Sequence, residues 1–255
     1  MRNIKVIIGI AMLVFSYGCG DGFSESRVDS AIIGGTGKGG SLARFAISGD
    51  RLYTIEQEII KTFDISDRQN MVYKSDTYIG FGIETLFPYN GNLFVGAQDG
   101  MYIYDLSDRD NPQWISYYAH FLSCDPVVVQ GNYAYVTLRV SECRPSQSFD
   151  ALEIIDISDI YNPIQINSYE LNEPYGLGVS GDLLFVCEGD NGLKVLDISN
   201  PYSIEMVKQF SGIHAYDVIP HQNILILTGE DGIRQYDFSD PQDITLLSEI
   251  YSSEG

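Results

Sequence analysis

The stretch GLKVLDISNPYSIEMV, residues 192–207, places an aspartate and a serine directly after a run in which apolar residues alternate. Nearly the same phrase occurs five times in the chain. Its aspartates are Asp64, Asp105, Asp156, Asp197 and Asp237, which lie 41, 51, 41 and 40 residues apart. A period near 41 residues is that of a repeated unit of four short strands. The phrase therefore marks a repeat, and the repeat decides the fold.

Each unit divides into four strands, most clearly in the unit that holds the opening stretch. The expected strands there cover residues 175–181, 183–189, 193–199 and 204–210. Alternating runs joined by short turns are typical of an antiparallel meander. The mature chain shows no convincing helical period. We therefore predict an all-β protein, a β-propeller of about five four-stranded antiparallel blades. The alternative is a six-bladed or incomplete ring, since only SAIIGG (30–35) is left over, and this strand could instead pair at the seam between first and last blades.

The aspartate and serine of the phrase have a structural explanation. The chain must reverse after the third strand of each unit, and the side-chain oxygens of Asp-x-Ser can accept hydrogen bonds from nearby backbone N–H groups. Four of the five turns also contain a proline, which stiffens the reversal: Pro112, Pro163, Pro201 and Pro241. Because five equivalent aspartates in one chain make no sense as five catalytic groups, we assign them to turns.

The phrases resemble the LVIVD repeat, in which aliphatic residues are followed by Asp-x-Ser and then Asn-Pro. The pattern stands in LEIIDISDIYNP (152–163) and in LKVLDISNP (193–201), and the resemblance covers roughly residues 41–250. The first unit, IIKTFDISDRQN (59–70), departs from it by lacking the proline. The resemblance implies a β-propeller on a bacterial cell-surface or periplasmic protein, and the family has no established enzymatic role.

The first residues have the pattern of an export signal. Arg2 and Lys5 precede an uncharged apolar run, which is too short to span a bilayer and ends at Gly18-Cys19. This end resembles a lipoprotein signal, although Ser16 replaces the usual leucine. We expect a lipoprotein signal peptide at 1–18, lipid on Cys19, a flexible tether at 19–40 and the propeller domain at 41–255. Ordinary cleaved secretion and an uncleaved anchor are the alternatives. The expected location is the bacterial cell envelope, lipid-anchored in the outer membrane, on its periplasmic side or at the cell surface.

The charge of the chain restricts its partners. The full sequence has a net charge of −20, and removal of Arg2 and Lys5 leaves 13 − 35 = −22. Such a surface repels phosphate backbones and anionic headgroups, so we expect no nucleic-acid binding and membrane contact only through the lipid anchor.

Catalytic and metal-binding motifs are not found in the sequence. The three histidines have no metal-ligand spacing, and neither a Gly-x-Ser-x-Gly elbow nor a phosphate-binding loop occurs. Acidic turns such as GDNG (189–192) offer too few oxygens for calcium. We therefore expect no cofactor and no metal, and a noncatalytic binding, adhesion or assembly module. The alternative is a glycan-active hydrolase or lyase that uses acidic residues at the channel mouth.

One face of the predicted ring is more elaborate than the other. About ten extra residues, at 138–150, fall in a loop between the second and third strands of a unit. Such loops open on the same face as the connections between units. Six residues that begin loops on this face are predicted to surround the channel mouth and to bind an unknown protein, a polar small molecule or a glycan: Arg44, Glu84, Asp125, Tyr175, His214 and Asp217.

The cysteines left after acylation allow one intramolecular bridge. Cys124 and Cys143 belong to loops on the elaborated face of one unit, with adjacent strands, and the exported location favours oxidation. We predict a disulfide between them, with free thiols as the alternative. Cys187 lies inside an alternating run and is expected to be a packed core residue.

Overall fold

The computed structural model describes residues 41–120, 126–139 and 150–251. The chain forms two units, Met1–Ile33 and Gly34–Gly255, and all described residues belong to the second. Several predictions lie outside the described residues: the signal peptide, the tether, the SAIIGG strand, Cys19, Asp125, and the disulfide between Cys124 and Cys143.

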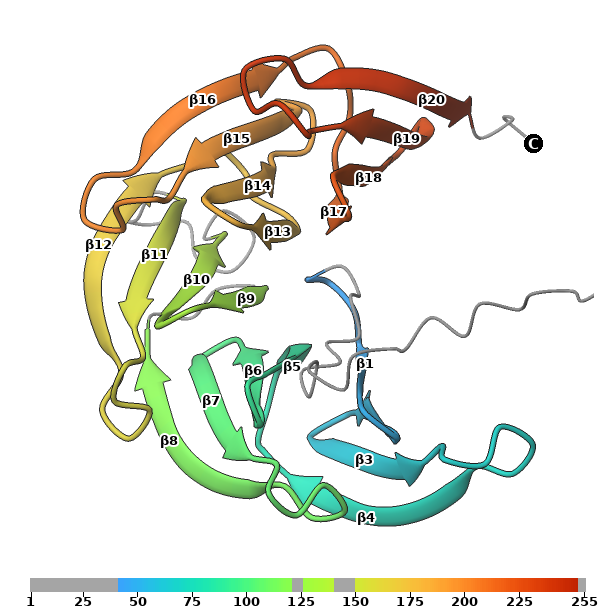
Figure 1. Cartoon of the computed structure of the whole chain (residues 1–255). Coiled ribbons are helices and arrows are strands. Elements are labelled where there is room, and N and C mark those ends of the chain that lie inside the picture. The colour runs from blue at the N-terminus through green and yellow to red at the C-terminus, as the bar shows by residue number, and fades with distance from the viewer. Residues whose placement is uncertain (1–40, 121–125, 140–149, 252–255) are drawn as a thin grey trace, which may run out of the picture. The chain divides into compact units, whose positions relative to one another are not determined.

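The described residues form five four-stranded antiparallel sheets, each in sequence order, which are the five blades of a β-propeller (Figure 1). The prediction of an all-β propeller is therefore confirmed.

Blade 1 contains β1 (Phe45–Ser48), β2 (Arg51–Glu56), β3 (Ile59–Asp64) and β4 (Val72–Tyr78); blade 2 contains β5 (Ile83–Tyr89), β6 (Asn92–Ala97), β7 (Gly100–Asp105) and β8 (Gln113–Ala119). Blade 3 contains β9 (Val127–Gln130), β10 (Tyr133–Leu138), β11 (Ala151–Asp156) and β12 (Ile164–Glu170). Blade 4 contains β13 (Leu177–Ser180), β14 (Leu183–Cys187), β15 (Leu193–Asp197) and β16 (Glu205–Phe210); blade 5 contains β17 (Asp217–His221), β18 (Ile224–Gly229), β19 (Gly232–Asp237) and β20 (Thr245–Tyr251).

Each blade has two faces, which we call upstream, toward the preceding blade, and downstream, toward the following blade. Side chains of a strand alternate between them. In β14, Phe185 lies on the downstream face and packs with Leu225 and Leu227 of β18, whereas Leu184 lies on the upstream face and packs with Leu152 of β11. A sheet that is buried on both faces needs apolar residues at every position, so β14 is a continuous apolar run, Leu183 to Cys187, and Cys187 is fully buried.

The third and fourth strands of every blade share one irregularity. Their register shifts by one residue at the same place in all five blades, between Thr62 and Phe63 in blade 1 and between Val195 and Leu196 in blade 4. A bulge of this kind bends and twists the strand that carries it. The repeat thus encodes the curvature of the outer strand as well as the strands themselves.

The Asp-x-Ser turns follow the third strands, and each contains a side-chain hydrogen bond. In every unit the aspartate Oδ1 accepts the N–H of the serine two residues later, at 2.8–2.9 Å; the pairs are Asp64 with Ser66, Asp105 with Ser107, Asp156 with Ser158, Asp197 with Ser199 and Asp237 with Ser239. The N–H and hydroxyl of Ser199 lower the pKa of Asp197. A second turn of the same kind follows three residues later in each unit, for example Asn200 accepting from the N–H of Tyr202 at 3.2 Å. This second turn was not among the features predicted from the sequence.

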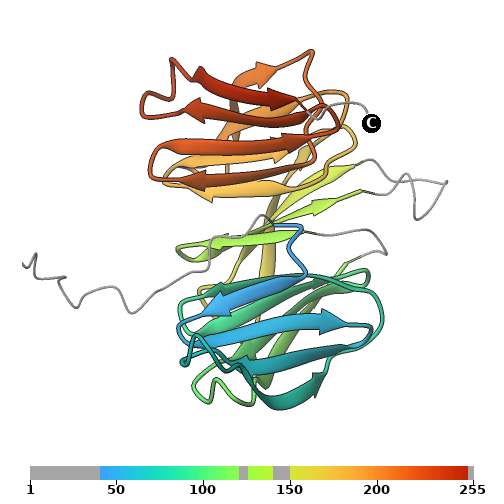
Figure 2. The ribbon, with the colours of Figure 1, turned by 90° about the vertical axis from the view of Figure 1, so that its right-hand side faces the viewer.

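The ring is interrupted between blade 5 and blade 1. The innermost strands of consecutive blades pack together from β1 through β5, β9 and β13 to β17. The described strands show no comparable packing between β17 and β1, and an opening separates these two strands (Figure 1). Viewed from that side, blade 5 and blade 1 lie on either side of the opening (Figure 2). We call this place the seam. The described residues thus form the predicted propeller of five blades, in which blades 5 and 1 do not pack on each other as the other consecutive blades do.

Candidate ligand-binding site

The loops that enter blades 4 and 5 are joined by backbone hydrogen bonds on one face of the ring. The N–H of Gly176 donates to the carbonyl of Tyr216 at 2.8 Å, and Gly189 and Ala215 exchange both N–H to carbonyl bonds at 3.0 Å. These bonds connect the loop before β13, the loop between β14 and β15, and the loop before β17. The side chains on these loops therefore stand on a fixed backbone.

Two glycines allow the loops to approach so closely. A Cβ atom at Gly176 would lie 2.1 Å from Oδ1 of Asp217. At Gly189 it would lie 2.7 Å from Cε2 of Tyr175, and the φ of +53° is one that side chains disfavour. Any other residue at either position would push the loops apart.

An aromatic and charged group of side chains, which we call the loop cluster, stands on this backbone: Arg139, Tyr175, Asp190, His214 and Tyr216. The Arg139 guanidinium lies 4.2 Å from the centre of the Tyr175 ring, and the Tyr175 and Tyr216 rings meet edge to face at 5.4 Å. The His214 ring packs on Tyr216 at 4.1 Å. Tyr216 remains 37% exposed. A stack of aromatic rings with a cation suits a polar ligand or a loop of a partner protein.

The orientation of His214 follows from its neighbours. Its Nδ1 accepts the N–H of Glu230 at 3.4 Å, so the proton of the neutral ring is on Nε2. That nitrogen lies 3.6 Å from Oδ1 of Asp190, whose side chain is 92% exposed. The cluster thus presents a carboxylate and an imidazole edge beside its aromatic rings.

Asp217 lies next to the cluster and is bound by the first described residues. Its Oδ1 accepts the N–H of Val218 at 2.9 Å and the hydroxyl of Ser41 at 3.5 Å, and the backbone of Ser41 and Leu42 also donates to it. The Ser41 oxygen in turn accepts the N–H of Leu177 at 2.6 Å. We call Ser41 and Leu42 the strap, because they connect blade 1 to the inner strands of blades 4 and 5. Burial raises the pKa of Asp217 to about 6, although its hydrogen bonds act in the opposite direction.

The predicted face residues are only partly brought together. Tyr175 and His214 meet through Tyr216, and Asp217 is adjacent in the chain. Glu84, in blade 2, accepts the side-chain amide of Gln98 at 3.2 Å. Arg44 is exposed at the beginning of blade 1, and its carbonyl accepts the N–H of Ile55. Asp125 lies outside the described residues.

Sequence reasoning missed Arg139, Asp190 and Tyr216. The sequence did carry a signal for Tyr216. When the repeats of blades 4 and 5 are aligned by strand register, Tyr216 takes the same place as Tyr175. Each tyrosine directly precedes the residue that pairs with the end of the second strand of its blade. The sequence carried no such signal for Arg139. Its guanidinium contacts the Tyr175 ring of the next blade, and no pattern within one repeat reveals a contact between blades.

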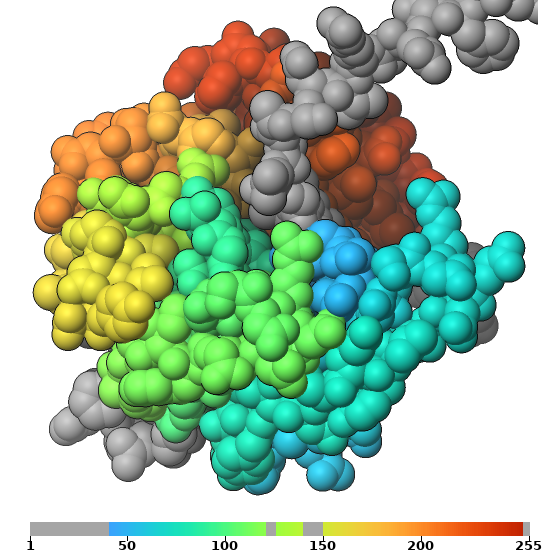
Figure 3. Space-filling view, turned by 60° about the horizontal axis from the view of Figure 1, so that its bottom comes forward, coloured from blue at the N-terminus to red at the C-terminus, as the bar shows by residue number. Residues whose placement is uncertain are grey.

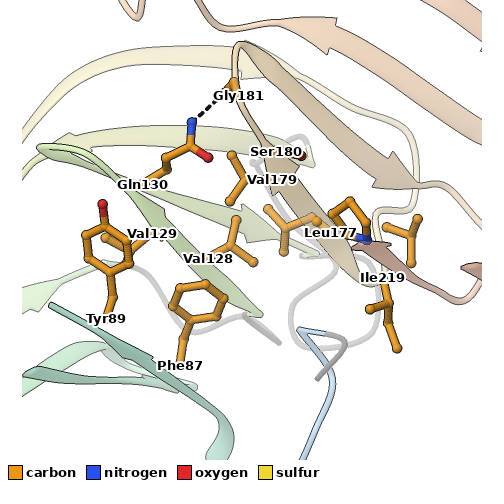
Figure 4. Close-up of a pocket in the computed structure, with 13 residues that line it drawn as sticks. Phe87, Tyr89, Val128, Val129, Gln130, Leu177, Val179, Ser180, Gly181 and Ile219 are labelled. Carbon is orange, nitrogen blue, oxygen red and sulfur yellow. Dashed lines mark hydrogen bonds between the residues drawn. The ribbon is translucent and has the colours of Figure 1, made fainter. Parts of the chain in front are cut away.

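The central channel contains an apolar pocket of about 170 Å³ (Figure 4). Phe87, Val128, Leu177 and Val179 line it from three neighbouring blades, and Gln130 donates a hydrogen bond across it to the carbonyl of Gly181. Sites for small molecules are usually about 300–1,000 Å³. The pocket is therefore too small for a metabolite of ordinary size, and the loop cluster is the better candidate for a binding site.

The described part of the chain contains no group of three or more histidine, cysteine, aspartate or glutamate side chains placed to hold a metal ion. It also contains no helix with the length and apolar character needed to cross a membrane.

Comparison with protein families supports the resemblance. Residues 123–141 and 176–211 match the LVIVD repeat family. These matches fall in the third and fourth units, so those two units are similar to LVIVD repeats. No protein of curated function matches the sequence.

Solved structures share the fold at low identity. The periplasmic gluconolactonase PpgL of Pseudomonas aeruginosa superposes with a TM-score of 0.60 at 13% identity, over 80% of this chain and 68% of that one. AztD of Citrobacter koseri gives 0.56 at 13%, over 78% and 58%. The designed protein Ika8 gives 0.60 at 15%, over 81% and 60%. The chain thus spans between 58% and 68% of the length of these structures, and the likeness concerns the fold alone.

Proposed function

We propose that the protein is a noncatalytic binding module of the bacterial cell envelope, held there by a lipid on Cys19, and that the loop cluster binds its ligand. The observation that carries this proposal is the Arg139–Tyr175–Tyr216–His214 stack, which is held rigidly by backbone bonds between blades and is still partly exposed. A rigid aromatic surface loses little conformational entropy on binding. The ligand class that fits is a glycan, a polar small molecule or a loop of another protein.

Three observations support the envelope as the location. The LVIVD repeats and the apolar segment before Cys19 are consistent with export, and one protein of similar fold is a periplasmic gluconolactonase. Replacing Cys19 with serine is expected to release the protein from membranes into the soluble fraction. If the variant partitions with membranes as the parent does, the lipid anchor is wrong.

Binding can be tested with one variant of the cluster and one matched control. Tyr216→Ala removes the central ring, whereas Tyr202→Ala removes a more exposed tyrosine, at 62%, in the turn after β15 on the opposite face. We expect glycan-array binding, or capture of a partner from envelopes in mild detergent, to fall at least tenfold for Tyr216→Ala and to persist for Tyr202→Ala. Equal behaviour of the two variants would contradict a binding role for the cluster.

A glycan-active hydrolase or lyase is the second candidate, and one observation favours it. The pKa of Asp217, about 6, suits a general acid. However, the strap covers this carboxyl, and Glu84 is held by its own partner in another blade. If the protein cleaves a glycan and Asp217→Asn abolishes the cleavage, the enzyme interpretation replaces the binding module.

A further inference from the structure

The apolar pocket in the central channel is built from one position of the repeat. Strand register makes four residues of the inner strands β5, β9, β13 and β17 equivalent, and all four line the pocket: Phe87, Val128, Gly178 and Ile219. The blades follow one another around the channel in chain order, as the colours of the space-filling view show (Figure 3). The side chain that each blade carries at this one position therefore sets the space that is left in the channel.

The walls of the pocket are fixed by the blades that carry them. Val128 is 2% exposed and Leu177 is fully buried. On the side of blade 4, Gly178 offers only backbone, since a Cβ atom there would lie 2.5 Å from Cδ of Pro220. The pocket thus exists before a ligand enters, and little free energy is lost to ordering its walls.

The two ends of the pocket differ in chemistry. The strap lies at one end, where the N–H of Leu177 donates to the Ser41 hydroxyl at 2.6 Å. At the other end, on the face opposite the loop cluster, two polar side chains reach across blade boundaries. The Tyr89 hydroxyl accepts an N–H of the turn after β9 at 2.7 Å, and Gln130 donates to the carbonyl of Gly181 (Figure 4). The pocket therefore has apolar walls and one polar end.

Size and charge restrict what can bind there. The volume of the pocket is about 170 Å³. An apolar cavity of about 150 Å³ holds one benzene molecule, so there is room for one ring and not for two. The described residues that line the pocket are all uncharged, and a charged ligand would lose its hydration without gaining a partner of opposite charge.

We propose that the channel pocket binds a neutral small molecule made of a single apolar ring with one uncharged polar substituent, such as a hydroxyl. The ring packs among Phe87, Val128 and Val179, and the substituent pairs with Tyr89 or Gln130 at the polar end. This site lies on the opposite side of the ring from the loop cluster, and the proposal does not depend on the ligand of that cluster.

Methyl NMR of the full chain in mild detergent, titrated with benzyl alcohol, tests the proposal at the level of single residues. The methyl signals of Val128, Leu177 and Val179 report on the pocket, and those of Val72, on the outer strand of blade 1, serve as the internal control. The free concentration of the probe is measured by dialysis, because the detergent also takes up the alcohol. We expect the three pocket signals to shift and saturate with a dissociation constant of about 0.1–10 mM, as befits so small a ligand.

The blocked variant is Val179→Phe, which adds a ring at a partly buried position of the wall. It should weaken binding of benzyl alcohol at least tenfold, whereas the matched Val72→Phe, at a position 44% exposed, should bind as the parent does. Tyr216→Ala should also bind as the parent does, so a failure of the loop cluster and a failure of this site remain distinguishable. Should Val179→Phe fail to fold, Ile219→Phe takes its place.

Two further probes test size and orientation. The two-ring 2-naphthalenemethanol should bind at least tenfold more weakly than benzyl alcohol. Tyr89→Phe should weaken benzyl alcohol about threefold to tenfold, the value of one hydrogen bond, and leave toluene unchanged.

Several results would overturn the proposal. They are pocket signals that do not saturate, a Val179→Phe variant that binds like the parent, and a two-ring probe that binds as tightly as benzyl alcohol. Tighter binding of N-acetylphenylalanine amide than of benzyl alcohol would also overturn it, because the occupant would then be an aromatic side chain of a partner protein.

Discussion

Blades 4 and 5 are consecutive copies of one repeat with the same strand register, yet they differ in burial. In β14 and β15 every residue but Asp197 is buried. In β18 and β19, by contrast, buried positions alternate with partly or fully exposed ones, and β20 is exposed throughout. The local sequence does not explain the difference, because Ile224, Ile226 and Ile233 are as apolar as Leu183, Phe185 and Leu193. The difference arises because blade 4 has two neighbours and blade 5 has one. A blade's stability is thus a property of its junctions.

The largest expected effect concerns a charge pair that blade 4 buries. Lys194 Nζ donates to Glu188 Oε1 at 2.7 Å, and both side chains are at most 9% exposed. Lys194→Met leaves an unpaired buried carboxylate and should reduce the free energy of unfolding by about 3–5 kcal/mol. The equivalent Arg234→Met in blade 5 should cost only about 1 kcal/mol, because its partner Asp231 is 40% exposed and stays hydrated. Urea denaturation measures both.

The double variant Glu188→Gln/Lys194→Met sharpens this test. The double variant removes the Glu188 carboxylate charge together with the Lys194 ammonium group. It should therefore recover more than half of the free energy of unfolding that Lys194→Met loses. Equal losses for Lys194→Met and Arg234→Met would contradict the idea that the exposed partner Asp231 stays hydrated while the buried partner Glu188 does not.

A matched pair of apolar truncations comes next in size. Leu193→Ala empties a fully buried position between blades 4 and 5 and should cost about 2–4 kcal/mol. Ile233→Ala, at the equivalent position on the seam, should cost about 1 kcal/mol or less, because the side chain is 45% exposed. The comparison fails if the two midpoints of urea unfolding fall by the same amount.

Asp217 should make stability at the seam depend on pH. Its pKa rises from an ordinary 3.8 to about 6 on folding, so the folded protein holds this proton at pH values where the unfolded chain has released it. The resulting contribution is complete below pH 3.8 and is lost as the pH rises through 6, at about 2–3 kcal/mol in all. Asp217→Asn should therefore remove a decline in the free energy of unfolding between pH 4 and 7.

The control for Asp217 is Asp190→Asn, in the neighbouring loop. Its side chain is 92% exposed, so this change should leave the decline in place. An unchanged pH dependence in Asp217→Asn would mean that the strap does not bury the carboxyl.

The smallest expected effect is one that the seam should not alter. Asp197→Ala and Asp237→Ala remove the same side-chain acceptor, which in both blades binds the N–H two residues later at 2.8 Å. Because that bond is local, the two variants should lower the melting temperature by the same few degrees or less. A much larger drop for Asp197→Ala would indicate that the turn is coupled to the junctions, which its geometry does not suggest.

The sequence by itself determined the repeat, the strands and the turns, because all three depend on neighbours in the chain. Alternation sets which residues share a face, and Asp-x-Ser binds a backbone group only two residues away, so a period near 41 was enough to predict five blades. It also singled out Tyr175, His214 and Asp217, through the rule that places connections between blades on one face.

Only the tertiary structure decided which side chains meet and where the ring stays open. Arg139 lies on Tyr175, and the strap on Asp217, across blade boundaries that no local pattern records. The seam could not be read from the sequence either, because Ile233 and Ile250 are as apolar as Leu193, which is buried, and Phe210, which is partly buried. The pattern of apolar residues determines which face of a blade can be buried. Whether a neighbouring blade buries that face depends on how the blades are arranged in space.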